Sequence, residues 1–198
     1  MSALTILRPP RPQLLAPARG PNTAATVAVA VGAVAAAVPW RLSESWWLEV
    51  GLVAVLLLAG MAVVVDITDH RIPDRLVLAS LVPTVAVLAV RVGSDGAGAA
   101  MPDVLFGAVA LALPLLVAHL TSPAALGFGD VKLGGALGAA LGLVDWRCSV
   151  VALCIASGLT AAVALGRRRS TVAFAPGLVA GTALVLVLAI FEGSPTWR

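Results

Sequence analysis

Long uncharged apolar runs recur along most of this chain, and they restrict its possible folds more than any other feature. Several runs approach the roughly 20 residues that a helix needs to cross the hydrocarbon core of a bilayer. Charged residues make up only 12% of the sequence, about half the share found in an ordinary soluble domain. The runs are rich in Ala, Val and Leu and do not alternate with polar residues, so they predict helices rather than barrel strands. The fold class predicted is therefore all-α, a polytopic transmembrane helical bundle.

About seven spans are predicted, and the short fifth run leaves six or eight open. Their approximate bounds are residues 23–40, 46–65, 76–92, a run within the uncharged stretch after Asp103 that ends near His119 or Leu120, and residues 133–144, 148–166 and 172–191. Residues 1–22 hold three arginines and several prolines without a compact apolar core, so they predict a flexible cytoplasmic tail rather than a cleaved signal peptide. Residues 23–192 would then form the membrane domain, and 193–198 a short C-terminal tail.

The positions of Lys and Arg predict the orientation. With a cytoplasmic N-terminus, nine basic residues fall on the cytoplasmic side and four on the other, as the positive-inside rule requires. The first group is Arg8, Arg11, Arg19, Arg71, Arg75, Lys132, Arg167, Arg168 and Arg169, and the second is Arg41, Arg91, Arg147 and Arg198. Dispersed residues that fix topology also account for the net charge of +3, so we expect no nucleic-acid partner.

Two acidic segments interrupt the apolar sequence. Asp66 follows directly on an apolar run, and Asp130 follows Gly127 and Gly129 just before the fifth run. Ionisable groups at membrane depth are costly and point to function by default. The predicted topology puts both segments on the cytoplasmic side, where the two carboxylates could meet as an acid/base pair. Asp69, further into the predicted loop, is an alternative partner for Asp130.

Glycines at every fourth position of the fifth run form one stripe on the predicted helix. They are Gly134, Gly138 and Gly142. Small residues spaced in this way allow helix backbones to approach closely in a membrane. The stripe therefore predicts a short helix packed tightly against its neighbours, with Asp130 at its N-terminal end.

The two acidic segments resemble the motifs of the prepilin peptidases (type IV leader peptidases), a branch of the GxGD membrane aspartyl proteases. The family's GxGDxK motif is complete, and so is its earlier motif, an Asp seven residues before the Pro of an Ile-Pro-Asp sequence. In the GxGDxK motif the matching residues are Gly127, Gly129, Asp130 and Lys132. In the earlier motif they are Asp66, Pro73 and Asp74. A later Pro-Phe-Gly-Pro element is only partly matched by residues 174–177. The resemblance covers roughly residues 46–191.

The resemblance implies a membrane aspartic endopeptidase with Asp66 and Asp130 as catalytic residues and the other motif residues in support. Such an enzyme sits in the bacterial plasma membrane and removes the leader of prepilin-like or pseudopilin-like substrates at the cytoplasmic face, just after a glycine. No cofactor and no metal are expected. Longer members carry an N-terminal domain with paired CxxC motifs and also methylate the new terminus. Since this chain lacks those cysteines, we expect peptidase activity without methyltransferase activity or an S-adenosylmethionine site.

Other interpretations stay open. Asp74 could simply cap the next helix. Lys132 could be an interfacial anchor, or it could influence the charge of Asp130 or act on the substrate. We expect no ligand role for His70 or His119. At the level of function, the same acids could serve a proton- or cation-coupled transporter, although no inverted repeat is visible. A catalytically silent assembly factor is a third class, and the oligomeric state is open.

Overall fold

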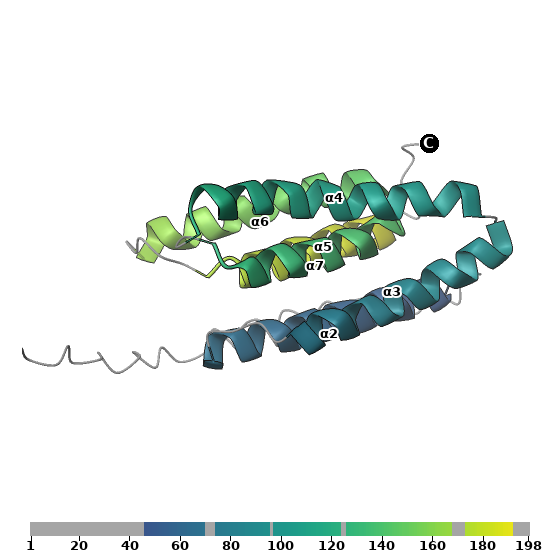
Figure 1. Cartoon of the computed structure of the whole chain (residues 1–198), viewed down its shortest axis with the longest axis horizontal. Coiled ribbons are helices and arrows are strands. Elements are labelled where there is room, and N and C mark those ends of the chain that lie inside the picture. The colour runs from purple at the N-terminus through teal and green to yellow at the C-terminus, as the bar shows by residue number, and fades with distance from the viewer. Residues whose placement is uncertain (1–45, 70–73, 96, 124–125, 168–172, 192–198) are drawn as a thin grey trace, which may run out of the picture.

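A computed structural model describes residues 46–69, 74–95, 97–123, 126–167 and 173–191. Within these residues the chain forms six α-helices and no strand, which confirms the all-α prediction for this part of the chain (Figure 1). The helices are α2 (Trp46–Asp69), α3 (Asp74–Asp95), α4 (Ala97–Thr121), α5 (Phe128–Gly142), α6 (Trp146–Arg167) and α7 (Ala175–Phe191). The first predicted span, residues 23–40, and both predicted tails lie outside the described residues.

Four of these helices are long and apolar enough to cross a membrane. The qualifying segments are Trp46–Val65, Asp74–Gly93, Ala100–Thr121 and Trp146–Gly166. Helix α7 contributes a shorter apolar segment, Ala175–Ala189, and α5 has only 15 residues. The prediction of seven spans is therefore supported for four of them within the described part of the chain.

The end of α2 differs from the prediction. The second span was expected to stop at Val65 and release Asp66 and Asp69 into a loop, but α2 continues to Asp69. Nothing in residues 66–69 breaks a helix, whereas Pro73 lacks a backbone donor and disfavours helical geometry in the residue before it. Asp66 and Asp69 thus lie in the last turn of α2, three residues apart, a spacing that puts both positions on the same side of a helix.

Helix α5 begins at Phe128, five residues before the predicted start of the fifth run. Gly127 precedes it with an extended backbone (φ −71°, ψ 147°). Asp130 consequently lies in the first turn, where the partial positive charge of a helix N-terminus favours a carboxylate. At 15 residues the helix is roughly 22 Å long, shorter than the ~30 Å hydrocarbon core. Such a helix needs other protein segments around it to satisfy its polar ends.

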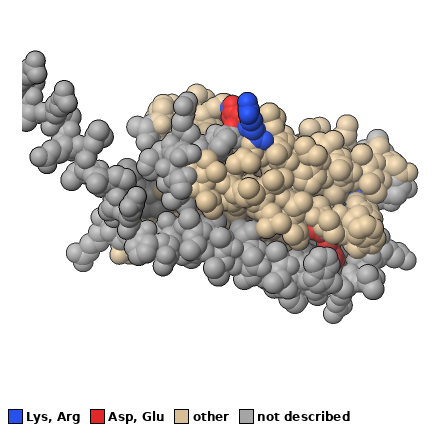
Figure 2. Space-filling view, turned by 90° about the horizontal axis from the view of Figure 1, so that it is seen from below, with Lys and Arg blue, Asp and Glu red and all other residues tan. Residues whose placement is uncertain are grey.

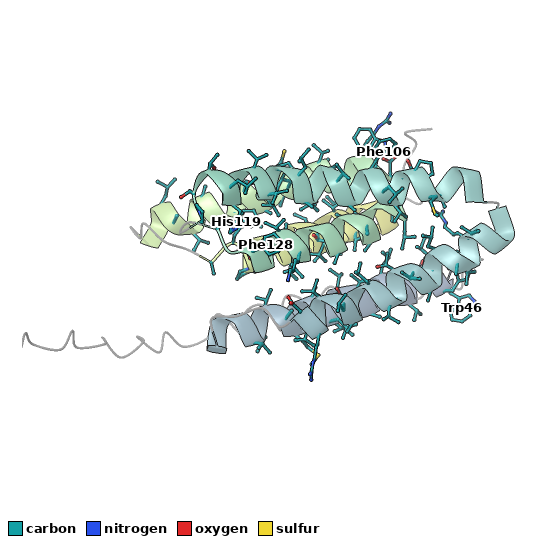
Figure 3. All side chains as sticks on the ribbon, viewed as in Figure 1. Trp46, Phe106, His119 and Phe128 are labelled. Carbon is teal, nitrogen blue, oxygen red and sulfur yellow. The ribbon has the colours of Figure 1, made fainter. Side chains whose placement is uncertain are left out.

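The helices run in alternating directions, so three of the connections lie at one end of the bundle (Figure 1). At this end, called here the Asp130 end, α2, α4 and α6 finish and α3, α5 and α7 begin. His119 and Phe128 lie there side by side, whereas Trp46 and Phe106 lie toward the opposite end (Figure 3). Because α3 and α5 both start at the Asp130 end, they run parallel to each other.

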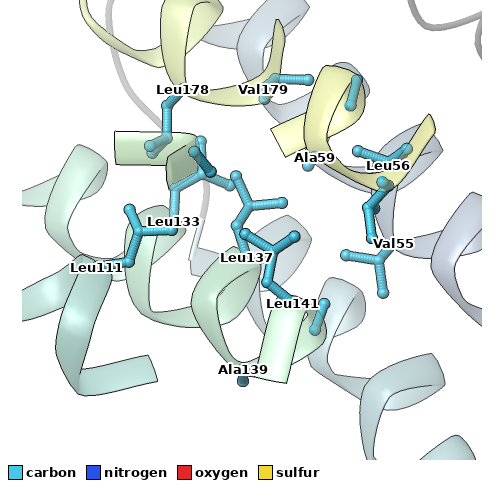
Figure 4. Close-up of a cluster of buried hydrophobic side chains, with 14 of the residues drawn as sticks. Val55, Leu56, Ala59, Leu111, Leu133, Leu137, Ala139, Leu141, Leu178 and Val179 are labelled. Carbon is cyan, nitrogen blue, oxygen red and sulfur yellow. The ribbon is translucent and has the colours of Figure 1, made fainter. Parts of the chain in front are cut away.

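Helix α5 is the centre of the bundle, because it contacts all five of the other described helices. Its leucines Leu133, Leu137 and Leu141 are completely buried. Figure 4 shows them between α4 on one side and α2 and α7 on the other, with Leu111, Val55 and Leu178 among the facing side chains. Asp130 therefore belongs to the helix that is surrounded by all the other described helices.

The predicted glycine stripe packs against α4. A Cβ atom placed on Gly138 would overlap the carbonyl oxygen of Gly107 and lie 3.0 Å from the Cα of Ala108. A Cβ atom on Gly142 would likewise overlap the backbone of Asp103. Only glycine permits this approach, since every other residue would push the two helix backbones apart. The prediction of close helix packing is confirmed, with α4 as the partner.

The outer surface suits a lipid environment. Large apolar side chains such as Leu78, Val82, Leu105 and Leu165 are exposed on it. On the face shown in Figure 2, very few of the described atoms belong to acidic or basic residues. Trp46 and Trp146, at the end opposite Asp130, are partly exposed, as is typical of aromatic residues at a membrane interface.

Candidate active site

Asp130 is a buried residue in the first turn of α5. Its residue is only 9% exposed, and its N–H donates to the carbonyl oxygen of Gly127 at 3.1 Å, closing the turn that opens α5. The carboxylate folds back toward Gly127, since a Cβ atom placed on that glycine would lie 3.6 Å from Oδ2. Because residue 127 is a glycine, it places no side-chain atom of its own over Oδ2, whereas a larger residue would cover this oxygen.

Asp66, the predicted partner of Asp130, lies near the same end of the bundle. Its backbone belongs to the last turn of α2, and α2 is in contact with α5. The side chains of Asp66 and Asp69 lie outside the described residues. The pairing of Asp66 with Asp130, and the choice between Asp66 and Asp69, therefore stay predictions.

Asp74 and Lys132, both predicted as supporting residues, form an ion pair. Lys132 Nζ donates to Asp74 Oδ1 at 2.7 Å. The pair joins the first residue of α3 to the first half of α5, two residues beyond Asp130. Its side chains are 67% exposed for Asp74 and 38% for Lys132. Asp74 is therefore more than a helix cap, and Lys132 is more than an isolated interfacial anchor, because each is the ion-pair partner of the other.

His119 makes a contact that the sequence did not reveal. Its Nδ1 lies 2.8 Å from the carbonyl oxygen of Leu126, so Nδ1 carries the proton and donates it. The imidazole also packs against Phe128, with 5.5 Å between ring centroids, and Lys132 Nζ lies 5.2 Å from the same Phe128 ring. The end of α4 is thereby tied to the residues on both sides of Gly127. No spacing rule connects positions 119 and 126 across a loop, so only the structure identifies this contact.

Within the described part of the chain, no three His, Cys, Asp or Glu side chains are grouped so that they could hold a metal ion. Both cysteines lie in α6, Cys148 buried and Cys154 exposed, and neither forms a disulfide. The described site is thus built from one buried carboxylate, glycines beside it, and an outer set of charged and aromatic side chains.

Comparison with protein families decides the assignment. The model of the type IV leader peptidase family matches residues 52–165, more than half of the chain. The chain belongs to this family. The resemblance to this family is therefore confirmed. The comparison with curated proteins found no match, and the comparison with solved structures found none either.

Membership makes the chain a protease, and the four long apolar helices of this leader peptidase agree with a membrane protein. The matched region runs from α2 almost to the end of α6 and contains Asp66, Asp74, Asp130 and Lys132. Helix α7, which begins within the partly matched 174–177 element, lies beyond it. The two complete motifs thus fall inside the family match, and the partly matched element at residues 174–177 falls outside it.

Replacing His119 with Leu is expected to loosen the segment before Gly127 and to lower the activity of the leader peptidase several-fold. The change removes one hydrogen bond, which is typically worth about 0.5–1.5 kcal/mol. Hydrogen exchange of a peptide covering residues 120–130 should become faster. His119→Asn is the matched control, because the Asn amide can donate from nearly the same position as Nδ1. Equal behaviour of the two variants would show that the His119 hydrogen bond does not hold this segment.

Proposed function

We propose that this leader peptidase is an aspartic endopeptidase that removes the leader of type IV prepilin-like proteins, with Asp66 and Asp130 as its catalytic pair. The observation that carries the proposal is the placement of Asp130. Asp130 is 9% exposed and lies at the start of the most enclosed helix, beside a glycine, and an ionisable group at membrane depth points to function by default. Membership of the leader peptidase family supports the same reading.

The reaction needs two proton transfers. A base takes a proton from water as the oxygen attacks the carbonyl carbon of the scissile bond, and an acid gives a proton to the departing amine nitrogen. Two carboxylates that share one proton can supply both, because the repulsion between like charges separates their titrations. In this proposal the ionised member of the pair activates the water, and the protonated member serves as the acid.

Glycines beside Asp130 suit an extended substrate. Gly127 has no side chain to cover Asp130 Oδ2, and Gly129 is partly exposed next to it. A peptide backbone can therefore approach the carboxylate more closely than side chains at these positions would permit. We propose that the residues around the leader glycine bind here, ahead of the substrate's hydrophobic helix.

The Asp130 end of the bundle is proposed to face the cytoplasm of a bacterial cell. Arg75 and Lys132 belong to this end, whereas Arg91 and Arg147 belong to the opposite one. Arg167 is the last residue of α6, which also finishes at this end. In the sequence, Arg71 comes two residues after the end of α2, and Arg168 and Arg169 directly follow α6. The positive-inside rule then makes this side cytoplasmic, where the basic leader of a substrate would await cleavage.

The proposal is tested by co-expression of the full chain with a type IV prepilin. Cleavage should appear as a shift on a gel, and N-terminal sequencing of the product should place the cut just after the leader glycine. If several prepilins remain intact, the proposal fails. In that case proton or cation uptake into vesicles would favour a transporter, and capture of pilus or secretion proteins without cleavage would favour an assembly factor.

A further inference from the structure

Two polar contacts that the structure describes join α3 to α5, and the first is the ion pair between Asp74 and Lys132. The second lies at the opposite end, where Arg91 Nη1 donates to the carbonyl oxygen of Leu143, just beyond the last residue of α5. The helices are parallel, so Asp74 and Lys132 both lie near their starts, and Arg91 and Leu143 both lie near their ends. Two contacts of this kind oppose sliding of one helix along the other.

The connection from α3 to α2 is short. Only residues 70–73 separate the end of α2 at Asp69 from the start of α3 at Asp74. The lengthwise position of α3 therefore limits where the last turn of α2, with Asp66, can lie. Asp130 is two residues before Lys132 on α5. The Asp74–Lys132 contact thus joins the two chain segments that carry the proposed catalytic pair.

Lys132 is poorly placed to act on Asp130 directly. Residues two apart in a helix project from nearly opposite sides, because each residue turns the helix by about 100°. Asp130 is accordingly buried, whereas Lys132 is partly exposed and paired with Asp74. The ammonium group also lies 5.2 Å from the Phe128 ring centroid, which restricts where it can move.

We propose that Asp74 and Lys132 are positioning residues: with Arg91 they fix α3 lengthwise against α5, and so set the separation between the end of α2 and Asp130. The proposal rests on the proposed function, since it concerns the geometry of that catalytic pair. An exposed ion pair contributes little to stability because solvent screens it. Its effect on a reaction can be much larger, since a shift of about 1 Å at reacting groups can reduce the rate ~100-fold.

The first test is a double-mutant cycle on prepilin cleavage. Asp74→Asn and Lys132→Gln should each lower kcat about 10-fold, with KM and the thermal midpoint nearly unchanged. The double neutral variant should be no worse than either single one, since both remove the same contact. The charge-exchanged variant, Asp74→Lys with Lys132→Asp, should recover most of the lost kcat. Arg75→Gln, which removes a neighbouring charge outside the pair, should behave as wild type.

The proposal would be overturned if the losses of kcat in the two single variants multiplied in the double neutral variant. It would also be overturned if the charge-exchanged variant recovered none of the lost kcat. A dead Lys132→Gln beside a fully active Asp74→Asn would overturn it as well, because Lys132 would then act without Asp74. These outcomes differ from failure of the proposed function, in which the wild type itself cleaves nothing.

Chemical cross-linking supplies a readout that does not require activity. In a chain carrying Cys148→Ala and Cys154→Ser, the pair Asp74→Cys and Lys132→Cys should be joined in membranes by a short bifunctional thiol reagent. Cross-linked protein should cleave prepilin faster than the same variant without reagent, since the covalent link replaces the ion pair. Failure to cross-link, or a cross-link that leaves kcat at the level of the single variants, would contradict the positioning role.

Discussion

Replacing Asp130 with Asn is expected to lower prepilin cleavage by about 10³-fold, within the range that positioned acids and bases contribute, while the protein accumulates normally in the membrane. Asn has nearly the same size and shape as Asp, so the packing around this 9% exposed residue should persist. What it loses is the ability to exchange a proton with water or with the departing amine. The rate is measured by N-terminal sequencing and densitometry of cleaved substrate over time.

The matched control is Asp103→Asn, which removes a carboxylate from α4 near the opposite end of the bundle. Its cleavage rate should equal that of the wild type. Normal cleavage by Asp130→Asn would rule out the aspartic mechanism for this chain. A parallel loss in both variants would instead indicate a general effect of removing a membrane carboxylate.

The same assay identifies the second catalytic residue. Asp66→Asn should be as inactive as Asp130→Asn, and the double variant should be no slower than either, because the two groups act as one unit. Asp69→Asn should remain active. The reverse pattern would make Asp69 the partner, which deserves an equal trial because both positions lie on the same side of the last turn of α2.

Replacing Gly138 with Ala is expected to destabilise the protein by about 2 kcal/mol or more, as overpacking in a close-packed interior does. The added methyl group would overlap Gly107 O and lie 2.9 Å from Gly107 C. These are backbone atoms, so no side-chain rotation can relieve the overlap, and α4 and α5 must separate. The thermal midpoint of the purified protein in detergent measures the loss, and cleavage should fall as well because α5 carries Asp130.

Two other glycines of α5 serve as controls for Gly138. At Gly135 a Cβ atom would meet only the Cβ of Ala112 at 3.6 Å, so Ala should be neutral or stabilising by up to about 1 kcal/mol through its better helix propensity. At Gly134 the nearest atom is Leu115 Cδ1 at 2.5 Å, the far end of a flexible side chain, and an intermediate effect is expected. Equal midpoints for all three variants would contradict the role of close α4–α5 approach.

The sequence predicted those features of the fold that repeat along the chain. Alternation of apolar runs and short polar segments located the helices, and the spacing of Gly134, Gly138 and Gly142 predicted a close helix contact that the structure confirms. Helix ends were predicted less well, because a charged residue was taken to end a span. Asp66 and Asp130 both lie inside helices instead, since a carboxylate breaks no helix and is favoured in a first turn.

Contacts between distant segments were the features that the sequence could not predict. Asp74 and Lys132 were each recognised as motif residues, but they are 58 positions apart, and nothing in either motif indicates that they meet. His119 was given no role, although its ring holds the carbonyl of Leu126. Such contacts depend on how helices lie against each other, and this is decided by the whole core rather than by local sequence.

The enclosed position of α5 also bears on how the protein is made. A nascent segment enters the bilayer by itself only if its own partitioning into lipid is favourable, and charged residues within it make that partitioning less favourable. Helix α5 is short, contains five glycines and carries both Asp130 and Lys132, so it is a poor candidate for independent insertion. It is better inserted as a hairpin with α4, whose backbone its glycines meet. Helices α6 and α7 are synthesised afterwards and also contact α5. The helices around Asp130 are therefore all present only when translation has passed α7.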